Sequence, residues 1–472
     1  MRILRTASLQ SGCVVCDRCP LDATVTTPMR HLPPILLLLA CGVAAMPAPA
    51  ADDVLAIGRA ELTRLEALSP GESAAIEGFP DGRGSTTTVH FEPMRVRAGD
   101  ARTLVVDERG ERELAPDRRR HLLGRSEDGR MRAALWFGPG FTDAGGVGIG
   151  AGGETFVVML HREGDRALLS ARPAEDSLPA GVVPRIADGD DALPSGRPMP
   201  GPLAVSLAPA TPAGASRIAT LAVDTDNELM SERFSNNTAA ASAWIDDLIA
   251  TMNLMYVSDL GVRLQRGTTI LRTTADPYVQ TGSPASGTHL NEFGGYWQAH
   301  YGQVSRSFAM LLSGKASTPN SSSGIAWVNS YCEVQSQGGS YSVNQVFRNP
   351  QIPVIYSALL VAHELGHNFG AQHTHCTNVA TGGAPTGSNT IDRCYSGESG
   401  CYSGATSCPA PGGDTAGTIM SYCHNRGCGP DDQNLLQFHP THVAALSVLV
   451  AQNTPSCLVV GGELIFADGF EG

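Results

Sequence analysis

The stretch HELGHNFGAQHTH, residues 363–375, constrains this chain more than any other part of its sequence, because it places four histidines and one glutamate within thirteen positions. On a helix, residues four apart lie on one face, so His363 and His367 can direct their imidazoles at one ion. Gly370 can adopt the left-handed conformation that ends a helix and turns the chain, which lets His373 approach the same ion. The pattern predicts three histidine ligands, with His375 outside the site.

Three protein ligands and one open position are typical of a catalytic zinc site. Glu364 follows the ligand His363 but projects differently, so it can reach a zinc-bound water without binding the metal. Zinc lowers the pKa of such a water towards ~7 and polarises a carbonyl group. Glu364 can then act as the general base and pass the proton to the leaving amine. A bare H-E-x-x-H occurs by chance on exposed helices, whereas the full H-E-x-x-H-x-x-G-x-x-H is far more specific.

The full motif, together with GTIMSYC around Met420, resembles the metzincin zinc endopeptidases, which are marked by this motif and a downstream Met-turn. The resemblance implies that Met420 lies beneath the zinc as an apolar floor. Within that family the chain is most similar to the adamalysin or reprolysin group. GIAWVNSYC resembles the edge strand of that group, and MNLMYVSDLGVRLQ resembles its first long helix and second strand. The resemblance covers roughly residues 217–457.

The fold class implied is α/β (α+β): a metzincin-type zinc protease domain with a twisted, mixed sheet and an active-site helix. An irregular part tied by disulfides would follow Gly370. A substrate peptide would lie extended along the edge strand and pair with its backbone; the strand positions concerned are Gly324, Ile325, Ala326 and Trp327. The function implied is that of a secreted endopeptidase with one catalytic Zn²⁺, which hydrolyses internal peptide bonds of protein or peptide substrates.

The sequence departs from the adamalysin pattern at three places. Thr374 stands where these relatives usually have an aspartate after the third histidine, so the support of that ligand is expected to differ. Tyr422 follows Met420 by two residues, as in astacins and serralysins, where this tyrosine lies over the zinc. Tyr422 is therefore a further ligand, a hydrogen-bond donor to the oxyanion, or a packed structural tyrosine. No cysteine occurs between residues 42 and 331, so a cysteine switch cannot operate through this part of the chain.

Composition divides the remaining chain. Short alternating apolar runs between Gly, Asp and Pro clusters predict a β-rich pro-region over residues 51–170. Residues 171–216 are rich in Pro, Ala, Gly and Asp, which predicts an exposed linker within which the pro-region is cut off. Residues 217–457 form the catalytic domain, with a helix over residues 353–370 that carries the zinc motif. Residues 458–472 form a C-terminal tail to which we assign no role.

The N-terminal segment predicts export. Residues 29–50 contain a basic start, an apolar run too short to span a bilayer, and a small-residue cleavage site, so we interpret them as a signal peptide that begins at Met29. The alternative is a lipid anchor on Cys41. Residues 1–28 precede this signal, and we interpret them as the product of a start assigned too far upstream.

Eight cysteines remain after residue 50, and their even number in an exported chain predicts four disulfides. The pairing cannot be read from spacing, but the adamalysin resemblance implies a bond between Cys332 and Cys457. The formal net charge of −13 argues against a nucleic-acid partner. No transmembrane segment is predicted, and the sequence does not define an oligomeric state.

Other interpretations stay open at this point. A zinc-stabilised adhesin or toxin with little turnover would also need the histidines, although a purely structural zinc site needs no general base and is normally closed by a fourth protein ligand. A hydrolase of cell-wall peptides is a second alternative. A weaker prediction is Ca²⁺ binding by the carboxylates of Asp224, Asp226 or Glu228, since oxygen ligands suit that ion.

Overall fold

The computed structural model describes residues 54–187, 192–197, 217–377, 389–409, 417–428 and 434–461. The chain divides into Met1–Ala51 and Asp52–Gly472, and all described residues belong to the second unit. The predictions for residues 1–28 and for the signal peptide, including Cys41, lie outside the described residues, as does most of the C-terminal tail.

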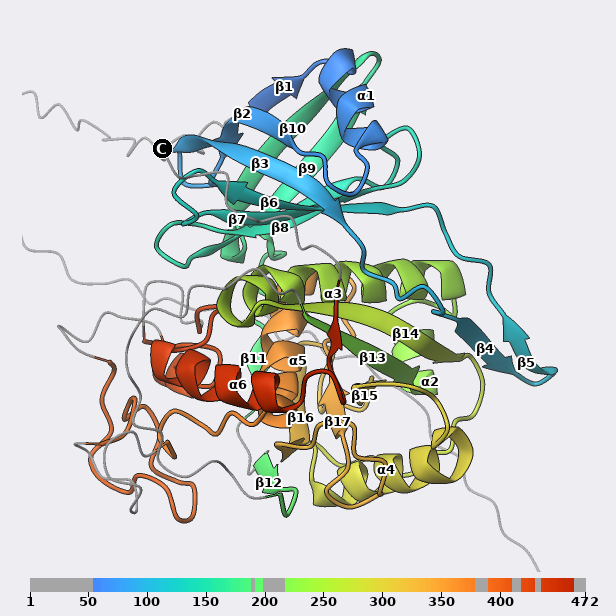
Figure 1. Ribbon diagram of the computed structural model, residues 1–472, viewed down its shortest axis with the longest axis vertical. Helices are drawn as coiled ribbons and strands as arrows, with labels where there is room; N and C mark the ends of the chain where they lie inside the picture. Colours follow the sequence, from blue (N-terminus) through green and yellow to red (C-terminus); the bar gives the residue numbers. More distant parts are fainter. Residues whose placement is uncertain are drawn as a thin grey trace, which may run out of the picture. The chain divides into compact units, whose positions relative to one another are not determined.

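The β-rich part is built on an antiparallel sheet with the strand order β1-β10-β9-β8-β7-β6-β3-β2 (Figure 1). Alternation of buried and half-buried residues, clear along the first six positions of β9, gives these strands one face towards an apolar core. The elements are β1 (Val54–Ile57), α1 (Arg59–Ala67), β2 (Ala74–Pro80), β3 (Thr86–Met94), β6 (Arg120–Ser126), β7 (Arg132–Phe137), β8 (Gly145–Ile149), β9 (Thr155–Glu163), β10 (Arg166–Pro173) and a 3₁₀ turn, Glu175–Ser177.

The second sheet is mixed and has the order β11-β16-β17-β15-β13-β14-β4-β5. Its central pairs are parallel, and β16 is antiparallel to β17. The strands of the expected catalytic domain are β13 (Arg217–Thr225), β14 (Val262–Arg272), β15 (Phe308–Ser313), β16 (Ser321–Val328), β17 (Tyr341–Gln345) and the short β18 (Val459–Val460). Its helices are α2 (Asn227–Glu232), α3 (Thr238–Leu260), α4 (Gly287–Tyr301), α5 (Val354–Phe369) and α6 (Pro440–Gln452), with a 3₁₀ turn at Cys423–Arg426.

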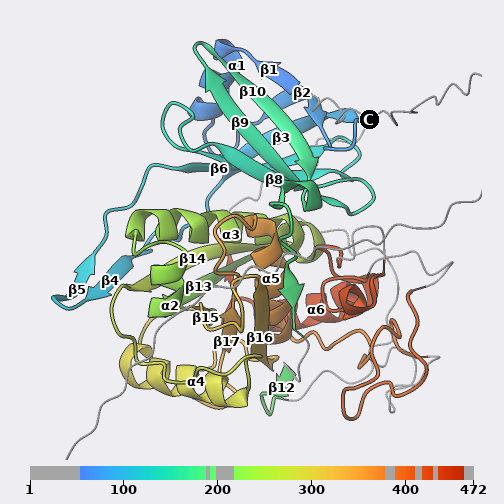
Figure 2. The same ribbon diagram turned by 180° about the vertical axis from the view of Figure 1, so that it is seen from behind.

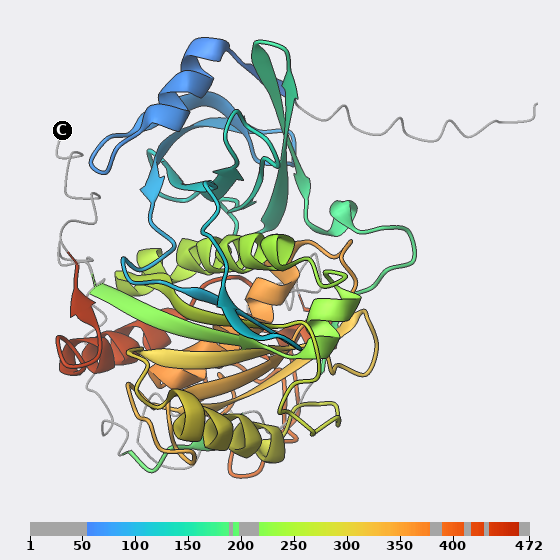
Figure 3. The same ribbon diagram turned by 90° about the vertical axis from the view of Figure 1, so that its right-hand side faces the viewer.

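Helix α3 lies between the two sheets (Figure 3). It begins after Asn237, whose side chain accepts a hydrogen bond from the Ala240 amide, and ends at Gly261 in the left-handed conformation. Every residue from Ile245 to Val257 is buried, as expected for a helix that is covered on opposite sides. Helix α4, which the sequence did not predict, covers the other face of the mixed sheet.

The hairpin of β4 (Thr103–Asp107) and β5 (Gly110–Glu113) differs from expectation. It was predicted within a separate β-rich unit, but β4 pairs in parallel with β14 of the mixed sheet. An isolated bridge between Arg97 and Arg266 precedes this pairing. Strand propensity does not specify a partner, so the sequence could predict the strand but not the sheet that it joins.

The Pro-rich segment also differs from the exposed linker expected over residues 171–216. Its short strands β11 (Arg185–Ile186) and β12 (Ala192–Pro194) both pair in parallel with β16, and β12 is seen beside that strand in Figure 2. The amide of Ala187 donates to the carbonyl of Ser322 at 2.8 Å. Backbone pairing needs little apolar composition, which is why the composition gave no sign of it.

Four disulfides are present, as predicted from the cysteine count. The Cys332–Cys457 bond implied by the adamalysin resemblance is confirmed, and it links the segment after β16 to the segment after α6. The other three bonds tie together the chain that follows Gly370: Cys376–Cys401, Cys394–Cys423 and Cys408–Cys428.

Candidate functional site

Helix α5 brings the residues of the zinc motif together. All sixteen residues of this helix are buried, and Gly370 ends it with φ 107° and ψ 7°, the left-handed conformation expected there. The amide of Ala371 donates to the carbonyl of Gly366 at 2.9 Å, which completes the turn. The chain then returns, and one ring nitrogen each of His363, His367 and His373 lies within 4.8 Å of the others.

The three imidazoles have their Nδ1 atoms engaged by oxygen. His363 Nδ1 lies 2.7 Å from the carbonyl oxygen of Ile419, and His367 Nδ1 lies 2.8 Å from that of Ala371. A carbonyl oxygen only accepts, so each Nδ1 carries the proton and leaves Nε2 as the basic atom. The Nε2 atoms of His363 and His367 are 3.1 Å apart. Three buried imidazoles arranged in this way could hold a metal ion.

Glu364 is fully buried and packs against the edge strand. A Cβ added to Gly324 would come within 2.2 Å of Glu364 Oε1. Real Cβ atoms do not approach other atoms so closely, so the glutamate reaches its position only because residue 324 is a glycine. The contact therefore places Glu364 between α5 and β16, the strand where a substrate was expected to lie.

Met420 lies against the helix between the histidines. Its Sδ would be 2.7 Å from a Cβ added to Gly366, and the side chain is fully buried. The carbonyl of Met420 accepts the amide of Thr374 at 3.1 Å, so this turn also contacts the segment that carries the third histidine. Met420 therefore packs against the helix that carries His363 and His367, and its place beneath a zinc ion stays a prediction.

Tyr422 lies among the histidines. Its ring centroid is 4.6 Å from that of His373 and 6.2 Å from that of His363, and only 3% of the residue is exposed. The structure thus brings Tyr422 to the three-histidine group, a position compatible with each of the roles considered from the sequence.

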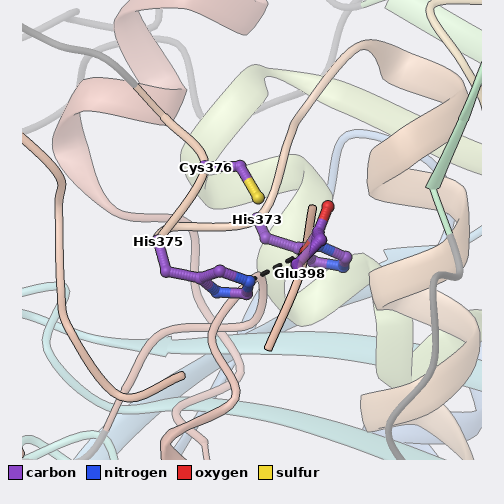
Figure 4. A group of neighbouring side chains, drawn as sticks. All are labelled: His373, His375, Cys376 and Glu398. Atoms are coloured by element: carbon purple, nitrogen blue, oxygen red, sulfur yellow. Dashed lines mark hydrogen bonds and ion pairs between the residues drawn. The ribbon is translucent and has the colours of Figure 1, made fainter. Parts of the chain in front are cut away.

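A carboxylate that the sequence did not indicate completes the surroundings of the third histidine. Glu398 Oε2 lies 2.6 Å from His373 Nδ1 and 2.8 Å from His375 Nε2 (Figure 4). Burial alone would raise the pKa of Glu398, but the hydrogen bonds from the two histidines outweigh it and lower that pKa to about 2. His375 is thus fully buried beside the site, with its Nε2 directed at Glu398.

The edge strand expected to bind substrate is β16, and it carries Gly324, Ile325, Ala326 and Trp327. Residues of β12 pair with Ala326 and Trp327 in this structure. A cavity of about 20 Å³ beside His363 is lined in part by Ile186 and Ala187, at the end of β11. The segment before the catalytic domain therefore occupies the strand edge next to the histidines.

The three carboxylates considered for Ca²⁺ have separate partners. Asp224 accepts two hydrogen bonds from Arg272, and Asp226 caps α2 by accepting the amide of Leu229. Glu228 lies 3.8 Å from the ammonium group of Lys315. Each carboxylate is thus matched with a different group, and the three are not among the side-chain clusters of the described residues that could hold a metal, so we do not propose a calcium site here.

Of the residues near the histidines, Glu398 was missed by sequence reasoning. It stands 25 residues from His373, in a loop without regular pattern. The one available signal was indirect. Cys376 lies three residues after His373, and Cys401 lies three residues after Glu398, so a disulfide between the two cysteines would bring His373 and Glu398 close together.

Residues 215–437, just under half of the chain, match the family model described as metallo-peptidase family M12. This match supports a metzincin-like metallopeptidase, and hence a hydrolase that acts on proteins or peptides. No curated protein matches the chain.

Among solved structures, one titled "Structure of a chaperone-substrate complex" is 12% identical, with a TM-score of 0.29 over 50% of this chain. The alignment spans 36% of that structure's chain, and likeness at this level carries no argument about fold or function. Within the described ranges, no helix combines the length and apolar character needed to cross a membrane.

Proposed function

We propose that this protein is a zinc-dependent endopeptidase whose catalytic domain is residues 217–457. The observation that carries the proposal is the group of three buried imidazoles within 4.8 Å of one another, on and just after a helix that also bears Glu364. His363, His367 and His373 would hold the zinc through Nε2. When bound, the zinc would supply a Lewis acid that activates water and polarises the substrate carbonyl.

Glu364 would serve as the general base in this reaction. It is adjacent to the ligand His363, is buried, and faces β16 at Gly324. Its carboxylate would accept the proton of the attacking water and transfer it to the nitrogen of the leaving amine, so that no covalent enzyme intermediate is needed. Tyr422 would donate its hydroxyl proton as a hydrogen bond to the oxyanion that develops on the carbonyl.

The edge of β16 supports cleavage of internal bonds in an extended chain. A peptide that adds to a sheet edge gains main-chain hydrogen bonds independently of its ends. The pairing of β11 and β12 with this same edge supports the proposal that an extended substrate backbone can pair there. Gly324, Ile325, Ala326 and Trp327 would provide the substrate-pairing positions.

The decisive test compares casein digestion by the exported protein with and without a zinc chelator, and with Glu364→Gln. We expect the variant to retain one zinc per chain and its melting temperature but to lose most turnover. His363→Ala, His367→Ala and His373→Ala should each lose zinc, and His375→Ala should retain it. A Glu364→Gln protein that digests casein at the wild-type rate would exclude the assigned general base, and a wild type that binds zinc without turnover would favour the adhesin or toxin alternative.

Residues 51–170 would act as a pro-region, joined through residues 171–216. Strands β11 and β12 run parallel to β16 and cover its edge, so substrate could not pair there while they remain. We expect proteolysis within the Pro-rich segment to precede activity. N-terminal sequencing of the active protein tests this, and an active chain that begins near Ala51 would contradict it.

Export through the signal peptide at residues 29–50 is proposed as the route to an oxidising compartment, where the four disulfides would persist. A lipid anchor at Cys41 is the alternative. Mass spectrometry of the exported protein separates the two, because only the anchored form would begin at a modified Cys41.

A further inference from the structure

Glu398 is the feature of the site that the proposed function leaves without a role. Its carboxylate lies against His373 and His375, both fully buried, and its own side chain is only 16% exposed. Burying a carboxylate away from water is costly unless it is paired and hydrogen-bonded. The carboxylate is hydrogen-bonded to two imidazoles, and one of them belongs to the third expected zinc ligand.

The third histidine differs from the other two in its acceptor. His363 and His367 donate from Nδ1 to backbone carbonyls, whereas His373 donates from Nδ1 to the carboxylate of Glu398. A carboxylate acceptor fixes the tautomer and the ring orientation and makes the opposite nitrogen a better donor to a metal. His373 also lies beyond the helix end, so the regular backbone that aligns His363 and His367 does not fix its position.

The loop that carries Glu398 is attached to the His373 segment. The Cys376–Cys401 disulfide lies three residues after both His373 and Glu398, and the amide of Tyr402 donates to the carbonyl of His375 at 3.1 Å. Thr374, where related sequences have aspartate, is engaged elsewhere, since its hydroxyl contacts Met420 O and Ser421 Oγ. The carboxylate beside the third ligand therefore comes from a distant loop held by a covalent bond.

We infer that Glu398, which lies beside His373 in Figure 4, is a positioning residue for this zinc ligand, and that the Cys376–Cys401 disulfide keeps it there. This inference rests on the proposed function, because it requires that His373 binds zinc. Glu398 does not touch substrate. It holds the proton of His373 on Nδ1 and keeps Nε2 directed at the metal, and His375 holds the carboxylate from its other side.

The test is the zinc affinity of the full chain, measured by competition with a chromophoric chelator, for wild type, Glu398→Gln and Ser399→Ala. Glu398→Gln keeps the size of the side chain and removes its charge, and Ser399→Ala changes the exposed neighbour. We expect Glu398→Gln to bind zinc about 10- to 100-fold more weakly at a temperature where its metal-free form is fully folded. That form should melt below wild type, because the ionised carboxylate hydrogen-bonded to two histidines stabilises the fold at neutral pH. Ser399→Ala should match wild type in both measurements.

Two outcomes would overturn the inference. The first is an affinity of Glu398→Gln equal to that of wild type. The second is a wild-type affinity of Glu398→Gln wherever its metal-free form is fully folded, with weaker binding only at temperatures where that form begins to unfold, which would assign Glu398 to loop stability alone.

If Glu398→Gln fails to fold, Glu398→Asp keeps the charge and withdraws it by one methylene. It should also weaken zinc binding, and an unchanged affinity would overturn the inference. Because this readout needs no proteolysis, a wild type that binds zinc but cleaves nothing would contradict the proposed function and leave the Glu398 comparison valid.

Discussion

A single carbon atom at residue 324 would collide with Glu364, which makes Gly324 a direct test of the general base. Gly324→Ala places a Cβ 2.2 Å from Oε1 and 2.4 Å from both Cδ and Cγ of Glu364, so the buried side chain has to move from Cγ outward. Misplacing a reacting group by about 1 Å can cost about 100-fold in rate. We therefore expect the casein turnover of Gly324→Ala to fall at least about 100-fold, with its zinc content and melting temperature retained.

The matched substitution is Gly295→Ala in α4, where an added Cβ meets nothing within 4 Å. Its turnover should equal that of wild type. Equal turnover in Gly324→Ala would show that Glu364 can work from another position.

Tyr422 offers a second test at this scale. The centroid of its ring lies 4.6 Å from that of His373, so we expect its hydroxyl to lie near the proposed metal position. Loss of one oxyanion donor typically costs ~3–4 kcal/mol of transition-state stabilisation. Tyr422→Phe should thus lower turnover about a hundredfold to a thousandfold at a nearly unchanged Michaelis constant and zinc content. Tyr402→Phe, which removes a hydroxyl that donates to Ala405, should leave turnover unaffected, and an unaffected Tyr422→Phe would make that tyrosine structural.

Residues of the site differ in how far the sequence could indicate them. His363, Glu364 and His367 follow from the fixed geometry of a helix, and His373 follows from the turn that Gly370 permits. Glu398 could not be found in this way, because its contact with His373 depends on the path of a loop and on one particular disulfide.

The same division applies to secondary-structure elements. Helices α3 and α5 have long apolar patterns with clear ends at Gly261 and Gly370, and both were predicted. The partners of β4, β11 and β12 were not, because strand pairing is decided by distant segments. Helix α4 was missed as well; glycines interrupt it at Gly294 and Gly295, and glycine is a weak helix former.

Asp226 connects three elements and gives a prediction about pH. It follows β13 and caps α2 through the amide of Leu229, and it accepts the amide of Gly314 after β15. Burial raises the pKa of this carboxyl from 3.8 to about 7, despite these hydrogen bonds and that of Ser313. The folded chain therefore binds this proton more tightly than the unfolded chain, and the free energy of unfolding falls as pH rises from about 4 to about 7, by at most about 1.4 kcal/mol per unit.

Asp226→Asn should remove this dependence, since the amide oxygen can accept both N–H groups and the amide nitrogen can donate to Ser313. Calorimetry between pH 4 and pH 8 is the measurement. We expect the melting temperature of the variant minus that of wild type to increase with pH up to about 7 and then to level off. Asp100→Asn, at an exposed turn, should show a constant difference. A constant difference for Asp226→Asn would mean that the carboxylate is ionised throughout this range.

At the scale of the whole described unit, the β-rich part and the proposed catalytic domain are joined by apolar packing and strand pairing as well as by the segment that connects them. Residues of both, such as Val105 and Leu123 on one side and Leu248 on the other, belong to one apolar cluster. Strand β4 extends the catalytic sheet beyond β14, and β11 and β12 extend it beyond β16. The β-rich part therefore contacts one edge of the mixed sheet and α3, and the Pro-rich segment contacts the other edge.

Charged contacts on α3 reinforce this association. Arg119 lies 2.7 Å and His121 lies 2.9 Å from the carboxylate of Asp247, and Arg97 pairs with Asp246. These groups are largely buried, so removal of one partner leaves an uncompensated charge and typically costs about 2–5 kcal/mol of binding. A cut within residues 198–216 breaks the chain but none of these contacts.

We therefore expect the cleaved β-rich part to stay bound and to keep the edge of β16 covered, so that activity follows dissociation and not the cut itself. After limited proteolysis, both pieces of wild type should elute together in size-exclusion chromatography, with casein digestion still low. Asp247→Asn should release the β-rich piece on dilution and give earlier digestion, whereas Glu113→Gln, which alters the exposed pair with Arg102, should behave like wild type. Immediate separation of the cut wild-type pieces without denaturant would refute this order of events, because the strand pairing and the α3 contacts would then be too weak to maintain latency.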